Sequence, residues 1–199
     1  MNAKASRIFL IFAAFLGGLV LFFGAIIFVT GRAPSPIGQA VAAVGGPFHL
    51  EDQNGKPVSD ADMKGKPFLV FFGFTHCPDI CPTTLFEISQ VMKALGPDAS
   101  RTGALFITVD PERDTPAVLK DYLSNFDPHL RGLTGNRPAI DAAIKAYRVY
   151  AKKIPLENGD YTMDHTAVVY LMDKDGNFVA PFSVGRTPEA EAADLRRYL

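Results

Sequence analysis

The sequence has little cysteine and almost no net charge, and both shortages narrow its possible functions. Only two of the 199 residues are cysteines, and the formal net charge is −1. A protein that tracks nucleic-acid phosphates normally carries an excess of Lys and Arg, so this balance argues against nucleic-acid binding. The chain also has no glycine-rich phosphate loop, no G-x-S-x-G and no H-E-x-x-H. Ordinary kinase or hydrolase chemistry is therefore not indicated.

The N-terminal quarter has the composition of a membrane anchor. The stretch from Ile8 to Val29 contains no charged residue, and as a helix it would span the roughly 30 Å hydrocarbon layer of a bilayer. A cleaved secretory signal is the alternative, but its apolar region usually runs about 7–15 residues. We therefore predict a cytoplasmic N-terminus at residues 1–7, a transmembrane helix at residues 8–29 and a linker at residues 30–46.

The flanking charges predict the orientation of this anchor. Lys4 and Arg7 precede the apolar stretch, whereas only Arg32 follows it closely. By the positive-inside tendency, the chain is a single-pass protein of the bacterial cytoplasmic (inner) membrane, with the domain of residues 47–199 in the periplasm. That compartment is oxidising, so two neighbouring cysteines form a disulfide there unless something reduces them.

The domain shows buried apolar strands that alternate with amphipathic helices. A hairpin is expected at Phe48–Val58, with its turn at Asn54-Gly55. The remaining expected strands are Phe68–Phe72, Leu105–Val109, Thr166–Met172 and Phe178–Phe182, and the expected helices are Pro82–Leu95, Pro116–Phe126, Pro138–Val149 and Pro188–Leu199. This order predicts the α/β class and the thioredoxin-like fold, a central mixed sheet flanked by helices.

The two cysteines, Cys77 and Cys81, directly follow the first buried strand of this scheme. Pro82 suits the first position of a helix, which places Cys81 at the N-cap and Cys77 in the preceding loop. Because helix N-termini favour negative charge, at least one thiol is expected to ionise more easily than a free cysteine. Pro78 and Asp79 between the cysteines argue against two inert core residues.

Two kinds of chemistry remain open for this pair. The cysteines can cycle between dithiol and disulfide, or they can act as soft metal ligands that need a third donor. The candidate donors are four histidines: His49, His76, His129 and His165. His49 and His129 are typical of structural or surface positions, and His76 adjoins Cys77 and is expected to point away from it. His165 opens the predicted strand Thr166–Met172, where redox proteins of the thioredoxin fold carry a cis-proline. It is the favoured third donor.

Three motifs together resemble the Sco/SenC family. They are Gly73-Phe74-Thr75-His76-Cys77-Pro78-Asp79-Ile80-Cys81-Pro82, then Val109-Asp110-Pro111-Glu112-Arg113-Asp114-Thr115-Pro116, and Asp164-His165-Thr166 followed by Tyr170-Leu171-Met172. The resemblance covers about Phe48–Leu199. It implies a membrane-tethered protein that binds one copper, as Cu(I) or Cu(II), through Cys77, Cys81 and His165. The implied partner is cytochrome c oxidase subunit II, whose binuclear copper centre the protein helps to assemble, with a copper donor and a thiol reductant of unknown identity.

We therefore expect a metallochaperone rather than an enzyme. The alternative is an extracytoplasmic thiol-disulfide oxidoreductase, in which Cys77 and Cys81 are the redox-active pair that reduces partner cysteines. A peroxiredoxin-like peroxidase is disfavoured because the P-x-x-x-T-x-x-C motif of that class is absent. Asp164 is interpreted either as an acceptor that orients His165 or as a solvated turn residue. Asp110 and the four residues after it are expected to support the cysteine loop or to meet a partner.

Overall fold

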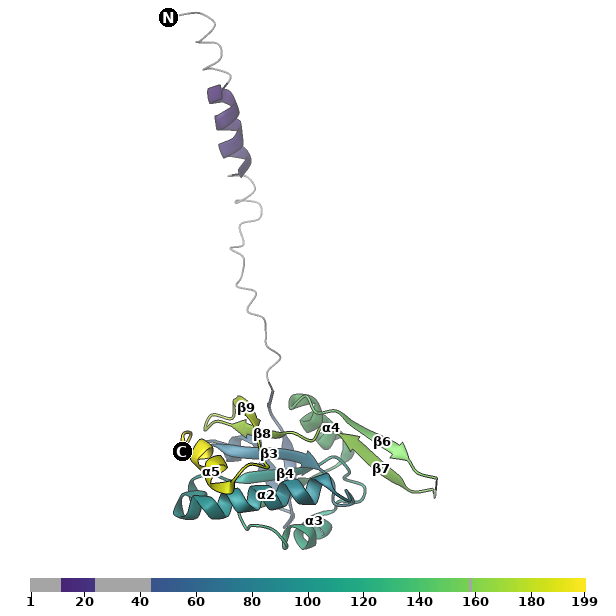
Figure 1. Ribbon diagram of the computed structural model, residues 1–199. Coiled ribbons are helices and arrows are strands. Elements are labelled where there is room, and N and C mark those ends of the chain that lie inside the picture. The colour runs from purple at the N-terminus through teal and green to yellow at the C-terminus, as the bar shows by residue number, and fades with distance from the viewer. Residues whose placement is uncertain (1–11, 24–43, 158) are drawn as a thin grey trace, which may run out of the picture. The chain divides into compact units, whose positions relative to one another are not determined.

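The computed structural model describes residues 12–23, 44–157 and 159–199. The chain divides into two units, Met1–Ala42 and Ala43–Leu199. Residues 12–23 form a helix whose side chains are all exposed (Figure 1). Among the described residues, no helix has both the length and the apolar character needed to cross a membrane. The predicted N-terminal segment, both ends of the predicted membrane helix and the linker up to residue 43 lie outside the described residues.

The second unit is built on a seven-stranded mixed sheet with the strand order β2-β1-β5-β4-β3-β8-β9 (Figure 1). The strands are β1 (His49–Asp52), β2 (Pro57–Ser59), β3 (Phe68–Gly73), β4 (Ala104–Thr108), β5 (Leu130–Thr134), β8 (Val169–Met172) and β9 (Phe178–Phe182). The three central strands β3, β4 and β5 run parallel, and β1, β8 and β9 add antiparallel edges. The carboxyl ends of β3 and β4 therefore open at the same edge of the sheet.

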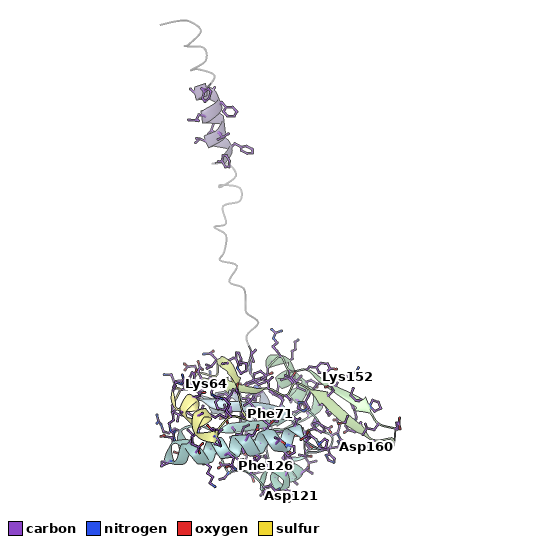
Figure 2. The ribbon with its side chains drawn as sticks, in the orientation of Figure 1. Lys64, Phe71, Asp121, Phe126, Lys152 and Asp160 are labelled. Carbon is purple, nitrogen blue, oxygen red and sulfur yellow. The ribbon has the colours of Figure 1, made fainter. Side chains whose placement is uncertain are left out.

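Strand β3 is the centre of the core, as its unbroken apolar sequence predicted. All six of its residues are buried, because helices cover both faces of a parallel sheet. Successive side chains alternate between these faces: the Phe71 ring packs near Phe106, whereas the Phe72 ring packs near Tyr147 on the other side. Figure 2 shows Phe71 inside the body of the domain.

Four α-helices accompany the sheet: α2 (Ile80–Leu95), α3 (Pro116–Leu123), α4 (Arg137–Ala146) and α5 (Pro188–Arg196). Helix α2 packs along α5, while α3 contacts β5 and α4 contacts β1. Helices α3, α4 and α5 carry proline at one of their first two positions, and the side chains of Thr115 and Asn136 cap α3 and α4. The predicted helices α3, α4 and α5 extended beyond these ends, since apolar residues continue into the following turns.

The sequence prediction missed three strands. Strand β5 contains Arg131 and Gly132, which interrupt the apolar pattern that revealed β3 and β4. A separate two-stranded hairpin consists of β6 (Ala151–Pro155) and β7 (Tyr161–His165), and most of its residues are exposed or only half-buried. The turn-forming sequence Glu157-Asn158-Gly159-Asp160 was the signal that could have revealed this hairpin. The β6–β7 hairpin projects from the body of the domain (Figure 1).

Candidate metal centre

The two cysteines lie where β3 gives way to α2. The chain turns after Phe74, whose carbonyl accepts a hydrogen bond from the Cys77 N–H at 3.2 Å. Helix α2 begins at Ile80, with Asp79 at its N-cap. Cys81 is therefore inside the first turn, and the prediction that it forms the N-cap was wrong by two residues. Its backbone N–H lies 3.4 Å from the Cys77 Sγ and donates toward it.

Glycine at position 73 allows this close packing. A Cβ added to Gly73 would lie 2.8 Å from the Cys81 Sγ and 2.7 Å from the Cε2 atom of Phe106. Any larger residue would therefore press the Cys81 thiol out of its place beneath the strand end. Gly73 therefore belongs to the site. The sequence analysis named this glycine only as the first residue of the cysteine motif and predicted no role for it.

His165 approaches the cysteines from the projecting hairpin. It is the last residue of β7, and β8 begins only at Val169. The prediction that His165 opens the strand Thr166–Met172 was therefore wrong, because His165 ends the preceding strand β7. The prediction did place the residue correctly near the cysteine loop. The His165 Nε2 lies 3.6 Å from the Cys81 Sγ, across 84 residues of sequence.

Hydrogen bonding fixes the tautomer of this imidazole. The His165 Nδ1 lies 3.1 Å from the carbonyl oxygen of Thr166; a carbonyl only accepts, so Nδ1 carries the proton and Nε2 presents its lone pair to the cysteines. The ring also meets Phe74 edge-on, with centroids 5.7 Å apart. The orienting acceptor is thus a backbone carbonyl. Asp164, the predicted alternative, is exposed.

Cys77, Cys81 and His165 together could hold a metal ion, because one ligand atom from each lies within 4.8 Å of the other two. No other group of three or more Cys, His, Asp or Glu residues gathers in this way within the described residues. The remaining histidines lie elsewhere: His49 is exposed on β1, His129 pairs with Asp127 at 2.7 Å, and the His76 Nδ1 lies 3.1 Å from the Thr75 hydroxyl.

Burial governs the protonation of two of these donors. Cys81 is fully buried, and desolvation raises the pKa of its thiol, with nearby Cys77 adding to the effect. The expectation of a more acidic thiol is therefore wrong for Cys81, because loss of water outweighs the favourable helix terminus. Burial lowers the pKa of the His165 imidazole, partly offset by its bond to Thr166. The site thus holds a protonated Cys81 thiol and a neutral imidazole at neutral pH.

A buried carboxylate anchors the cysteine loop. Asp114 follows β4 and accepts hydrogen bonds from the Thr75 N–H at 3.1 Å and from the Thr75 hydroxyl at 2.6 Å. The Thr108 hydroxyl donates to it at 2.6 Å. Burial raises the pKa of this carboxyl, against these hydrogen bonds. Asp114, the last residue of the run Asp110–Asp114, therefore supports the loop, which was one of the two roles expected for this run.

Comparisons with known proteins match most of this chain. The SCO1/SenC family model matches residues 38–199. A SCO2-like protein of Rickettsia prowazekii is 42% identical over 141 residues, which is 70% of this chain and 69% of that protein. The chain spans 64% of the length of the mitochondrial SCO2 homologue of Mus musculus, with 43% identity.

Solved structures show the same fold. The structure of Bradyrhizobium japonicum ScoI with copper bound has a TM-score of 0.77 and 66% identity, over 79% of this chain and all of that one. A structure of BsSco, described as a member of the Sco family of cytochrome c oxidase assembly proteins and as having a disulfide switch, has a TM-score of 0.62 and 29% identity, over 77% of this chain and 92% of that one.

Proposed function

Because this chain belongs to the SCO1/SenC family, we propose that it is a copper chaperone which binds one copper ion per chain through Cys77, Cys81 and His165. The observation that carries the proposal is the convergence of these three donors within 4.8 Å. We further propose that the chaperone assists assembly of cytochrome c oxidase and delivers its copper to the binuclear centre of subunit II. The related ScoI structure with copper bound supports the choice of metal, and the description of BsSco supports the choice of pathway.

The donor chemistry suits copper as cargo. Two thiolates favour Cu(I), and an added imidazole allows the same site to hold Cu(II). Three protein ligands leave a coordination position open, into which a ligand of a receiving protein can enter. Cys77 is the more exposed of the two cysteines, so exchange of the ion is expected to begin at its sulfur.

Loading the site releases protons. A thiol must lose its proton before it binds copper, and burial holds the proton on Cys81. Copper therefore has to displace that proton from a sulfur that is buried away from water. The new metal–sulfur bond would stabilise the thiolate in place of hydration. The same requirement means that a Cys77–Cys81 disulfide cannot accept copper until it is reduced.

We also propose that the protein is held in the bacterial cytoplasmic membrane by residues 8–29, with residues 1–7 in the cytoplasm. Residues 30–46 then tether the copper-binding domain of residues 47–199 in the periplasm. The all-round exposure of large apolar side chains on helix 12–23 supports this placement, since a helix that is apolar on every face needs an apolar environment.

A second function is favoured by the contact between the cysteines. The sulfur of the half-buried Cys77 lies within 4.8 Å of the sulfur of the buried Cys81, which suits an exposed attacking thiol and a buried resolving thiol. In this role the Cys77 thiolate attacks a partner disulfide and forms a mixed disulfide. Cys81 then displaces the partner as a dithiol, and two electrons leave the pair as it becomes a disulfide. A thiol reductant must restore it.

Copper titration with absorption spectroscopy tests the main proposal. The wild-type protein is expected to take up one copper per chain, whereas Cys77→Ser, Cys81→Ser and His165→Ala each abolish stable binding. Full copper occupancy in His165→Ala would remove that residue from the ligand set. The second function requires both cysteines but not His165, so wild-type rates of partner-disulfide reduction in His165→Ala, without copper binding, would favour it.

A further inference from the structure

Tyr161, the first residue of β7, is held from two sides by the loop that follows β4. Its hydroxyl donates to Asp110 Oδ1 at 2.9 Å, and the Arg113 guanidinium carbon lies 3.7 Å from the centre of its ring. Arg113 Nε donates to Asp110 Oδ2 at 2.5 Å, and Nη1 donates to the Tyr161 carbonyl at 3.0 Å. We refer to Asp110, Arg113 and Tyr161 as the latch.

The hairpin is joined to the domain by side chains and not by strand pairing. Strands β6 and β7 pair with each other and not with the main sheet, and Asp160 lies toward the outer end of this hairpin (Figure 2). Besides the latch, Met163 is buried in the core and the His165 ring contacts Phe74. An isolated two-stranded hairpin is only marginally stable in water. Its orientation relative to the domain must therefore be set by its side-chain attachments, of which the latch has the largest number of polar contacts.

The latch and the candidate metal ligand occupy opposite ends of one short strand. Tyr161 begins β7 and His165 ends it, so at about 3.3 Å per residue the two lie roughly 13 Å apart. A paired strand is stiff over that length. Tilting the hairpin about the latch would therefore shift the His165 Nε2, which stands 3.6 Å from the Cys81 Sγ.

The composition of the latch fits positioning better than stabilisation. Asp110 is fully buried and the Arg113 side chain is 17% exposed, and the Arg113 Nη2 is buried without a hydrogen-bond partner in the described part of the chain. Burial of an ion pair often adds little net stability. The single hydrogen bond from Arg113 to Asp110 and the stacking of Arg113 on Tyr161 do fix the direction of approach of the two segments.

We propose that Arg113 and Tyr161 are positioning residues for the metal site, which hold β7 so that His165 reaches the third coordination position. The inference rests on the proposed copper function. It has a consequence for oxidation state: thiolates are the ligands that Cu(I) prefers, whereas Cu(II) depends more on the imidazole. Loosening the latch should therefore weaken Cu(II) binding more than Cu(I) binding.

The test compares Arg113→Met and Tyr161→Phe with wild type in the full-length protein, titrated separately with Cu(I) and with Cu(II). We expect Arg113→Met to weaken Cu(II) binding at least tenfold and to shift its absorption bands, while Cu(I) affinity stays within about threefold of wild type. Tyr161→Phe, which removes only the bond to Asp110, should show the same pattern with a smaller loss. His165→Ala is expected to retain only weak copper binding by the two cysteines. In that background neither substitution should lower this residual affinity further, because the latch acts through His165.

Arg131→Met is the matched control, since Arg131 pairs with the buried Asp52 at 2.9 Å on the β1–β5 side of the sheet. It should leave both copper affinities unchanged. Equal losses in Arg131→Met, or losses in Arg113→Met that persist in the His165→Ala background, would overturn the inference.

If wild type binds no copper, the proposed function fails, and amide hydrogen exchange in the metal-free protein then tests whether the latch holds the hairpin. Exchange at Met163–His165 should then quicken in Arg113→Met but not in Arg131→Met, and equal exchange in both would also overturn the inference.

Discussion

Replacing Gly73 with alanine should damage both the fold and the metal site. The added Cβ would meet the Phe106 Cε2 at 2.7 Å and the Cys81 Sγ at 2.8 Å, whereas unstrained contacts between such atoms fall near 3.5–4.0 Å. One of the partners must therefore shift by roughly 0.7 Å or more. Both are fully buried, so the shift cannot be absorbed at the surface, and overpacking of this kind costs about 1–3 kcal/mol.

The same shift sets the expected effect on copper. Metal sites tolerate ligand displacements of about 0.2 Å, and a displaced Cys81 Sγ would also leave its present 3.6 Å contact with the His165 Nε2. We expect the copper affinity of Gly73→Ala to fall at least tenfold, which corresponds to about 1.4 kcal/mol. Urea unfolding of the metal-free protein and competition titration of copper measure the two losses separately.

Two other glycines provide controls for this experiment. A Cβ at Gly103 would have its nearest neighbour at 3.9 Å, whereas one at Gly132 would lie 2.6 Å from the Leu123 Cδ1, away from the cysteines. Gly103→Ala should behave as wild type in both assays, and Gly132→Ala should lose stability but retain copper affinity. Wild-type copper affinity in Gly73→Ala would refute the argument that this glycine makes room for the Cys81 thiol.

Two further predictions concern carboxylates near the site. Asp114→Ala leaves three hydrogen-bond donors unsatisfied and should lower the free energy of unfolding by about 3 kcal/mol. Asp114→Asn should cost less than half as much in thermal unfolding, because burial already favours the neutral carboxyl. Hydrogen bonds from Arg137 lower the pKa of Glu112 to about 2. Its stabilising effect is therefore fully present above the unfolded carboxyl pKa and is lost as the pH falls from that pKa through about 2. The free energy of unfolding of Glu112→Gln should therefore match that of wild type at low pH, where the carboxyl is protonated. At neutral pH the two should differ by less than about 1 kcal/mol, since the Glu112 side chain is half-exposed.

The parts of the fold that the sequence predicted are those in which one strong local pattern operates. The short unbroken apolar run of β3 predicted a strand that is buried on both faces of the sheet, and all six of its residues are buried. Strand β5 escaped prediction because its Gly132 is required by close packing against Leu123, a contact that no local pattern reveals. The hairpin β6–β7 escaped because most of its residues are exposed or half-buried, so no strong apolar pattern marks it, and its contacts with a distant loop are not visible in the sequence.

The candidate site divides in the same way. Its residue types and the neighbourhood of His165 followed from motifs and from the expected topology, and the role of the three donors as ligands stays a prediction. The protonation of Cys81 could not be predicted, because the helix terminus is visible in the sequence whereas the burial that overrides it arises only when Gly73 brings the strand end against the thiol. Arg113 was recognised as part of a motif, but its stacking on Tyr161 connects segments 48 residues apart.

His165 lies 84 positions after Cys81, so the three donors come together only in the folded chain. Unfolding separates His165 from the cysteines. Copper held by all three donors therefore shifts the folding equilibrium by mass action, and at a free concentration a hundred times the dissociation constant it adds up to about 2.7 kcal/mol to the stability. Occupancy of the site is thereby converted into resistance to unfolding and to proteolysis of the unfolded form. By the same relation, the copper-free form of the chain is the shorter-lived of the two.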